Sequence, residues 1–372
     1  MKKFEYLVRF TTPAFLGNAE QSGQWRTPPF KALLRQWWRV AWAAGNGFGN
    51  GDAVVERMRR EEGLLFGNAW LEGDFCKSLV RLRLDRWGAG TLKSWDGLEQ
   101  EKVQHCEVQK TGYKVGPHAY LGYGPLDGRG NTKFSEKVNA AIQAGESATF
   151  AIAFPTTHKS PDLKDLVEAN APRLERALWL MERFGTLGGR SRNGWGSFAL
   201  IPLPPAEGAG ERDTPPPAGA LPLRPWRDCL DRDWPHAIGR DENGPLIWQT
   251  APHNDWQSLM KTLAVIKIGL RTAFTFHTGR NAPAPEDRHW LSYPVTNHSV
   301  APWGNQARLP NSLRFKVRAL PAGKLIGVIF HVPCRPPPAF GPDRQIIEIE
   351  NVWRRVHAFL DNPEQQLPRS EA

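Results

Sequence analysis

Strand and helix patterns follow one another in residues 1–201 in an order that few folds can accommodate. Apolar residues alternate with polar ones where strands are expected, and they recur at i, i+3, i+4 and i+7 where helices are expected. The expected elements are a strand at Phe4–Phe10, a helix at Phe30–Trp42, strands at Val80–Leu84 and Thr149–Phe154, a helix opened by Pro172, and a strand at Ser197–Ile201. Their order is βαββαβ.

That order is the arrangement of a ferredoxin-like (RRM-type) domain, which we expect over residues 1–201. A Pro-rich stretch without apolar periodicity follows, and it predicts a linker at 202–244. Beyond the linker, the expected elements are a helix at 255–270, strands at 272–276, 313–317 and 325–332, and a closing helix at 345–360. They predict a second ferredoxin-like domain over 245–362, whose strand order the patterns leave open, and a flexible tail at 363–372. The predicted class is therefore α+β, with two fused ferredoxin-like domains and long insertions.

The charge of the chain favours a polyanionic partner. Lys and Arg number 48 against 38 Asp and Glu, a formal net charge of +10, which attracts nucleic acid, although an inert basic surface is also consistent with it. The four cysteines, at positions 76, 106, 229 and 334, lack the spacing of a metal site, so we expect reduced thiols. The sequence shows neither a signal-peptide pattern nor a membrane span, and we expect a cytoplasmic protein.

A glycine-rich segment, Gly185–Gly196, lies between the last expected helix and the last expected strand of the first domain. We expect its backbone N–H groups to form a nest for a phosphate, its arginines to add charge and its tryptophan to offer a stacking face. The residues involved are Gly188, Gly189, Arg190, Arg192 and Trp195. A plain glycine-rich turn is the alternative. Neither a P-loop nor a dinucleotide fingerprint fits, because both require a strand before the glycines and a helix after them.

This loop reads G-x-x-G-G-R-x-R-x-G-x-G before the last strand of the domain, and it resembles the loop of the RAMP superfamily of CRISPR proteins. The segments Thr12–Gln21 and Arg26–Arg39 are similar to the opening of the first RAMP subunit of type III-B CRISPR (Cmr) effector complexes. Clear similarity covers mainly residues 1–45, 120–125 and 180–200, and it is loose around 288–295 and 308–317.

The resemblance implies a non-catalytic, RNA-binding subunit of an RNA-guided antiviral ribonucleoprotein, built from two fused ferredoxin-like domains. Its expected partners are the CRISPR RNA, towards its 3′ end, the target RNA and other RAMP subunits of the complex. No cofactor, metal or membrane is expected.

The residues of the first expected helix point to RNA independently of the resemblance. Lys31, Arg35 and Arg39 are spaced at i, i+4 and i+8, and Arg26 precedes them. Three aligned cations repel one another unless an anion is near, so we expect RNA phosphates along this line. A solvated helix face is the alternative. Three tryptophans of the same helix fall within its apolar stripe and are predicted to be core: Trp37, Trp38 and Trp42.

A long insertion between the second and third strands mixes aromatic residues, glycines and cations over residues 110–125. Its candidates for stacking on unpaired bases are Tyr113, Tyr120 and Tyr123, and its candidates for phosphate contacts are Lys110, Lys114 and His118. A packed irregular hairpin is the alternative.

An RNA endonuclease is the main competing function, and a protein-only assembly cap is a third. Metal-assisted cleavage would use a carboxylate in the loop after the first strand, where the sequence offers only Glu20. His118 is the best single candidate for a general base, but a lone histidine is more often structural. Four further histidines lack a ligand spacing, namely His277, His289, His298 and His331. We therefore expect no catalytic residues and no metal site.

Overall fold

The computed structural model describes residues 1–20, 22–69, 75–98, 100–105, 114–128, 131–204 and 219–370. The chain forms two compact units. The first comprises residues 1–96, 134–222 and 316–319, and the second comprises residues 97–133, 223–315 and 320–372. The insertion that we assigned to the first domain therefore belongs largely to the second unit.

The first unit is built around a four-stranded antiparallel sheet in the order β2-β7-β1-β8. Its elements are β1 (Lys2–Phe10), α1 (Thr27–Gly45), α2 (Asp52–Phe66), β2 (Arg81–Leu84), β7 (Ser147–Phe154), α4 (Pro161–Phe184) and β8 (Phe198–Pro202). The predicted βαββαβ order is present here, with α2 as an addition that the sequence patterns did not indicate. The expected α+β class is confirmed.

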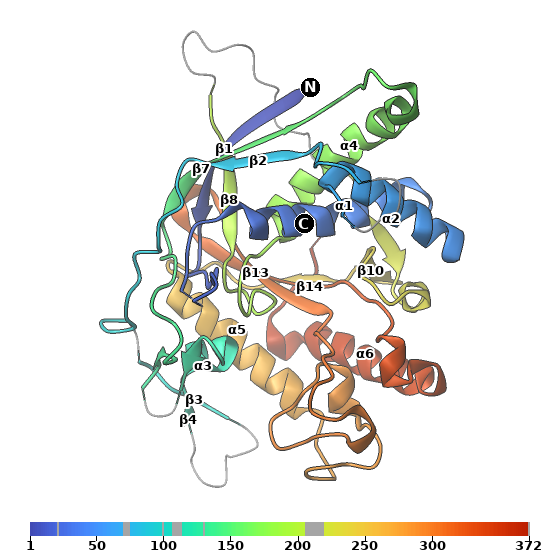
Figure 1. Ribbon diagram of the computed structural model, residues 1–372. Helices are drawn as coiled ribbons and strands as arrows, with labels where there is room; N and C mark the ends of the chain where they lie inside the picture. The colour runs from blue at the N-terminus through green and yellow to red at the C-terminus, as the bar shows by residue number, and fades with distance from the viewer. Residues whose placement is uncertain are drawn as a thin grey trace. The chain divides into compact units, whose positions relative to one another are not determined.

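The core of the first unit lies between this sheet and two helices, α1 and α4, which pack against each other beside it (Figure 1). Every second residue of β1 is buried, as its alternation predicts. The ring of Phe30 on α1 lies 5.1 Å from that of Phe150 on β7, and Trp37 lies 5.7 Å from Phe184 of α4. The three tryptophans of α1 are buried as predicted. The apolar side of α1 is thus buried in the core, and its basic side faces outward.

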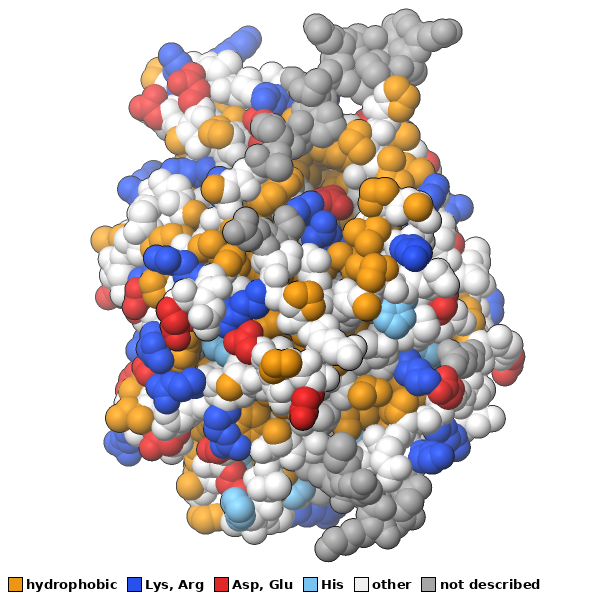
Figure 2. Space-filling view, turned by 180° about the vertical axis from the view of Figure 1, so that it is seen from behind, with side chains coloured by type: hydrophobic (Ala, Val, Ile, Leu, Met, Phe, Trp, Pro, Cys, Tyr) orange, Lys and Arg blue, Asp and Glu red, His pale blue; other side chains and the backbone are white. Residues whose placement is uncertain are grey.

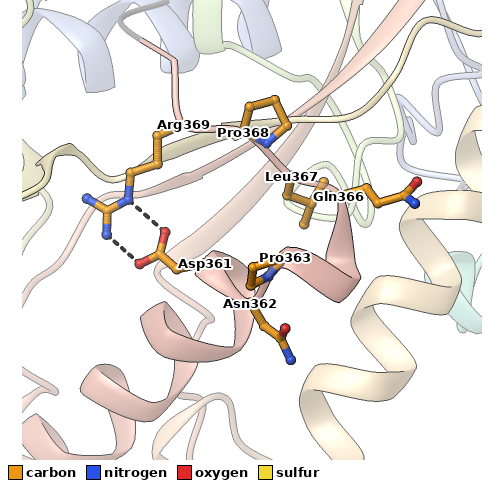
Figure 3. A pocket seen from close by; sticks show the side chains of 7 residues that line it. All are labelled: Asp361, Asn362, Pro363, Gln366, Leu367, Pro368 and Arg369. Atoms are coloured by element: carbon orange, nitrogen blue, oxygen red, sulfur yellow. Dashed lines mark hydrogen bonds and ion pairs between the residues drawn. The ribbon is translucent and has the colours of Figure 1, made fainter.

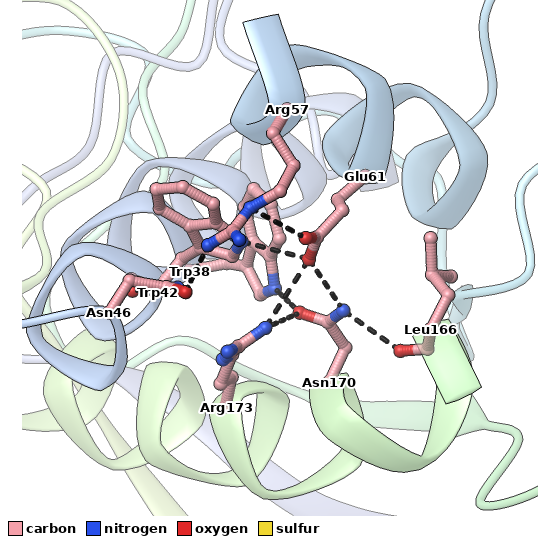
Figure 4. Close-up of polar contacts among 8 residues, drawn as sticks. All are labelled: Trp38, Trp42, Asn46, Arg57, Glu61, Leu166, Asn170 and Arg173. Carbon is pink, nitrogen blue, oxygen red and sulfur yellow. Dashed lines mark hydrogen bonds and ion pairs between the residues drawn. The ribbon is translucent and has the colours of Figure 1, made fainter. Parts of the chain in front are cut away.

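Helix α2 is held against α1 and α4 by the carboxylate of Glu61 (Figure 4). Glu61 Oε2 accepts hydrogen bonds from Trp42 Nε1 at 2.8 Å and from Asn170 Nδ2 at 2.9 Å, and Arg173 Nη1 lies 3.3 Å away. Asn170 in turn accepts a bond from Trp38 Nε1 at 3.1 Å. These bonds satisfy indole and amide donors that burial would otherwise leave costly, and they fix the position of α2.

The second unit contains smaller sheets, of which the described residues form β12-β14-β13 and β11-β10-β9. Its strands are β3 (Val103–Gln104), β4 (Lys114–Val115), β5 (Leu126–Asp127), β9 (Leu223–Pro225), β10 (Ile238–Asp241), β11 (Gly244–Pro245), β12 (Ile247–Gln249), β13 (Leu313–Ala319, shared with the first unit) and β14 (Leu325–His331), with β6 (Lys133–Phe134) at its boundary. Its helices are α3 (Pro117–Gly122), α5 (Trp256–Thr272) and α6 (Ile346–Asp361). The strands and helices predicted at 313–317, 325–332, 255–270 and 345–360 are confirmed. Within the described residues no four-stranded sheet appears in this unit.

Two predicted element positions are wrong. Helix α4 begins at Pro161 rather than at Pro172, because its buried face continues upstream through Val167 and Ala171. The strand predicted at 272–276 does not form, because α5 continues to Thr272.

The predicted linker and tail also differ from the structure. Residues 223–244 include β9, β10 and β11 and bury Trp226 and Cys229. Residues 205–218 of the predicted linker lie outside the described residues. Within the predicted flexible tail, the described residues 363–370 make defined contacts. Arg369 bonds to Asp241 at 2.7 Å and to Asp361 at 2.6 Å, and the tail borders a pocket of about 510 Å³ (Figure 3). The two charged residues that line this pocket, Asp361 and Arg369, pair with each other, so the pocket has no net charge to attract a ligand.

Candidate nucleic-acid interface

A groove of about 800 Å³ follows the basic side of α1 in the first unit. We call it the α1 groove. It is lined by Pro28, Pro29, Lys31, Ala32, Leu33, Arg35, Gln36, Arg39, Phe66, Thr186, Leu187 and Gly188. The groove therefore brings together the predicted basic line of α1 and the start of the glycine-rich loop, two segments about 150 residues apart in the sequence.

Two arginines of the groove share one carboxylate, that of Glu62 on α2. Arg39 donates from Nε to Oε1 at 2.5 Å and from Nη2 to Oε2 at 2.8 Å. Arg35 donates from Nη2 to Oε2 at 2.9 Å, and its Nε lies 2.8 Å from Oε1. The Glu62 side chain is 1% exposed, whereas those of Arg35 and Arg39 are 35% and 36% exposed. The carboxylate is thus sealed beneath two guanidinium groups that reach solvent.

The electrostatics of the groove follow from this arrangement. Burial tends to raise the pKa of Glu62, but the hydrogen bonds and positive charges of Arg35 and Arg39 outweigh burial and hold that pKa below its usual value. The pKa of Lys31 is lowered, first by burial and then by the nearby charge of Arg35. No carboxylate of the described residues lies within ion-pair distance of Lys31. Three cations and one buried anion leave the groove with a net positive charge.

The charge-repulsion argument from the sequence needs a correction. It required an anion near Lys31, Arg35 and Arg39, and assigned that role to RNA. For Arg35 and Arg39, Glu62 supplies this anion from within the protein. Sequence reasoning missed Glu62 because α2 was not predicted. Its signal was the acidic pair Glu61-Glu62 near the end of an amphipathic stretch.

Two of the three segments that carry the family resemblance, the glycine-rich loop and Thr12–Gln21, interlock in the structure. Thr12 is fully buried, its Oγ1 donates to Gly194 O at 2.8 Å, and it accepts from Ser197 N at 3.0 Å. Gly196 N donates to Pro13 O at 2.9 Å, and Gly189 N donates to Phe15 O at 2.9 Å. The glycine-rich loop and the segment after β1 are therefore one structural feature.

The predicted phosphate nest is not what the glycines of the loop provide. Several of their N–H groups already donate to backbone carbonyls, and the glycines serve close packing. Gly188 has φ +90°, and a Cβ there would lie 2.6 Å from Phe15 O. At Gly196, with φ +65°, a Cβ would lie 1.8 Å from Leu187 O. The alternative of a structural turn accounts for these glycines.

The other loop residues divide into exposed cations and a buried ring. Arg190, at φ +58°, is exposed and Arg192 is half-buried, but neither lines the α1 groove. Trp195 is fully buried, with its ring 5.4 Å from Phe15 and 5.8 Å from Trp95. The prediction that Trp195 offers a stacking face is therefore wrong, since both sides of its ring lie in the core.

The candidate residues of the insertion lie in the second unit. Lys114 is exposed on β4, whereas His118 is 2% exposed, bonds through Nε2 to Gln257 O at 3.0 Å, and has a pKa lowered by burial. With its ring buried against Gln257, His118 is not placed to meet an RNA phosphate from solvent. Tyr120 is half-buried and Tyr123 is 61% exposed. Lys110, Tyr113 and Cys106 lie outside the described residues.

Of the four histidines of the second half, His289 and His298 lie together against the ring of Phe276, whereas His331 contacts other residues. His289 is buried, and His298 stacks on Phe276 at 3.9 Å. The ring of His331 has different partners. Its Nε2 lies 2.9 Å from Ser312 Oγ, and its Nδ1 lies 2.9 Å from His357 Nε2. In the part of the chain that the structure describes, no three His, Cys, Asp or Glu side chains are grouped as metal ligands would be.

The distribution of charge on one face of the molecule marks no further site. On the face shown in Figure 2, Lys and Arg side chains are scattered among acidic and hydrophobic ones, so the net charge alone marks no site. Arg26 precedes α1 and bonds through Nη1 to Gly17 O at 3.2 Å. No helix among the described residues has the length and apolarity needed to cross a membrane.

Comparison with known proteins gives structural neighbours only. Neither a protein-family model nor a curated protein matches the sequence. The chain is similar to Cmr1 from Pyrococcus furiosus in its apo form, with a TM-score of 0.43 and 15% identity over 89% of this chain and 88% of that one. It is also similar to a chain of the type III-B Cmr-β complex bound to cognate target RNA, with a TM-score of 0.47 and 11% identity over 95% and 99% of the two chains. A Cmr-β structure with AMPPnP and single-stranded DNA matches at a TM-score of 0.45 and 12% identity over 96% and 98%.

Proposed function

We propose that this chain is a non-catalytic RNA-binding subunit of a type III-B CRISPR RNA-guided effector complex. In this proposal the first unit is a ferredoxin-like RAMP domain and the second a diverged one. The chain contacts the CRISPR RNA towards its 3′ end and the target RNA, beside other RAMP subunits. The observation that carries RNA binding is the α1 groove, in which Glu62 fixes two partly exposed arginines next to Lys31.

The arginine pair suits phosphate because each guanidinium has two usable edges. The edge formed by Nε and Nη2 faces Glu62 in both Arg35 and Arg39, which leaves Nη1 turned away from the carboxylate. A second bidentate interaction with a phosphate oxygen pair can form on that outer edge. Residues four apart on α1 are spaced by about 6 Å, which is comparable with successive phosphates of an extended strand. The groove is therefore suited to a single strand that runs along α1.

The assignment to a CRISPR complex rests on the resembling motifs. Their interlocking through Thr12, Gly194 and Gly196 supports it, because both segments are needed to build one feature at the same end of the sheet. A chance match of two separate motifs would not require them to bond to each other.

Full-length protein is expected to bind single-stranded RNA without cutting it. Fluorescence anisotropy with labelled RNA, in EDTA or with Mg²⁺ or Mn²⁺, followed by a denaturing gel of the same samples, separates the three functions. Equal binding in all conditions and intact RNA are the expected results. Metal-dependent products that disappear in Glu20→Ala or His118→Ala would indicate a nuclease instead. An absence of binding would favour a protein-only assembly cap.

A further inference from the structure

One exposed tryptophan is left unexplained by the fold. Trp87 follows β2 in the first unit and is 56% exposed, and among the described residues no other tryptophan is exposed to this degree. Its ring makes no contact with another aromatic ring of the described chain. Leaving a large apolar ring in water forgoes the stabilisation that burial would give, so a solvent-facing indole on a folded segment suggests a use outside the core.

The backbone around Trp87 is held firmly from both sides. Its carbonyl accepts a hydrogen bond from Gln24 Nε2 at 2.8 Å, and the next carbonyl, of Gly88, accepts from Trp25 N at 3.0 Å. Gly90 N donates to Gly23 O at 2.9 Å. The indole thus belongs to a segment whose backbone is already held by hydrogen bonds. Stacking of a ligand on it would therefore cost little additional backbone entropy.

The same contacts place Trp87 at one end of the α1 groove. Trp25, which bonds to the segment of Trp87, is followed by Arg26 and then by Thr27, where α1 begins. Pro28 and Pro29, in the first turn of α1, line the groove. The bonds to Gln24 and Trp25 therefore set Trp87 beside the N-terminal end of α1.

The charged residues near Trp87 along the chain are mixed. Arg26 precedes α1 directly and bonds to Gly17 O at 3.2 Å. Arg86 lies 3.9 Å from Glu146 and over the ring of Trp25 at 5.7 Å, and Asp85 is exposed. The cations that line the groove itself are Lys31, Arg35 and Arg39.

We propose that Trp87 stacks on an unpaired base of the RNA strand whose phosphates lie in the α1 groove. This inference rests on the proposed function and adds the recognition element that Trp195 cannot supply. Base stacking on an aromatic ring tolerates any base but requires an open base face. The ligand is therefore single-stranded RNA, and a duplex of the same sequence is excluded from this platform.

The direct test uses RNA in which one base at a time is replaced by the fluorescent analogue 2-aminopurine. With wild-type protein, one position along the strand is expected to be quenched by stacking on the indole. In Trp87→Leu, which keeps an apolar side chain but removes the ring, that quenching should disappear. A pattern of quenching that is identical in wild type and Trp87→Leu would overturn the proposal.

Affinity measurements separate stacking from the phosphate contacts. Trp87→Leu should weaken RNA binding about tenfold, and Trp87→Phe less, while the dependence of affinity on salt stays unchanged because no charge is lost. Ile347→Ala removes another exposed apolar side chain, 69% exposed on α6, and should have no effect. Unchanged affinity in Trp87→Leu, with normal salt-dependent binding by wild type, would overturn the stacking role alone. Failure of wild type to bind RNA would overturn both proposals.

Discussion

Replacing Arg35 and Arg39 together by alanine is expected to lower the free energy of unfolding by about 3 kcal/mol. The substitutions leave the Glu62 carboxylate buried without its two partners, and an uncompensated buried charge costs several kcal/mol. The value lies at the lower end of that range because both guanidinium groups are partly exposed and screened. Urea unfolding followed by circular dichroism measures the loss.

The cause is tested by adding Glu62→Gln to the double variant. Removing the unpaired carboxylate charge of Glu62 should recover much of the lost stability. Glu62→Gln alone, in a protein that keeps both arginines, should lower the free energy of unfolding. Arg59→Ala, at an exposed position of α2, is the control and should change little. If the double variant is as stable as wild type, the ion pairs contribute nothing measurable to folding.

The same pair predicts a dependence on pH. Because the pKa of Glu62 is lowered in the folded protein, its contribution is fully present above the ordinary glutamate pKa of about 4.3 and is lost as pH falls through the lowered value. The stability gap between wild type and the alanine double variant should therefore close in acid.

Exchanging Arg35 and Arg39 for lysine is expected to weaken RNA binding about 100-fold although the charge is kept. A lysine ammonium is a point charge, so it cannot bind Glu62 with one edge and a phosphate with another. About 1.4 kcal/mol for each lost charged interaction gives this factor. Anisotropy titrations with single-stranded RNA measure it.

The matched control is Lys31→Arg, which changes a groove cation that has no carboxylate partner among the described residues. It should bind RNA within about twofold of wild type, since a guanidinium can replace a single ammonium contact. If the double lysine variant is folded and binds as tightly as wild type, the two arginines serve Glu62 only.

The sequence predicted the first unit well because its elements carry regular periodicity. The strand at Phe4–Phe10 and the helix at Phe30–Trp42 are present within a few residues of their expected bounds. The predicted start of α4 was wrong because either of two prolines, Pro161 and Pro172, can occupy the first turn of a helix. Sheets of two and three short strands in the second unit leave too little periodicity to predict an order.

The candidate site was predicted in part. The basic line of α1 and the glycine-rich loop do meet at one groove, but their partners come from distant segments that no local pattern reveals. Glu62 on α2 supplies the anion near the arginines, and Trp195 enters the core while Trp87 remains exposed. The glycine-rich loop predicted a stacking face at Trp195, and only the tertiary structure shows which ring faces solvent.

The salt dependence of RNA binding tests the central claim most directly, namely that the α1 groove holds the phosphates of single-stranded RNA. The variant Lys31→Gln leaves the contacts of Arg35 and Arg39 with Glu62 intact and should fold normally. Each lost phosphate contact on a single strand flattens the slope of log K against log salt by about 0.7, so this variant should be flatter by up to about 0.7 units. A folded Lys31→Gln variant with wild-type affinity and slope would contradict the claim.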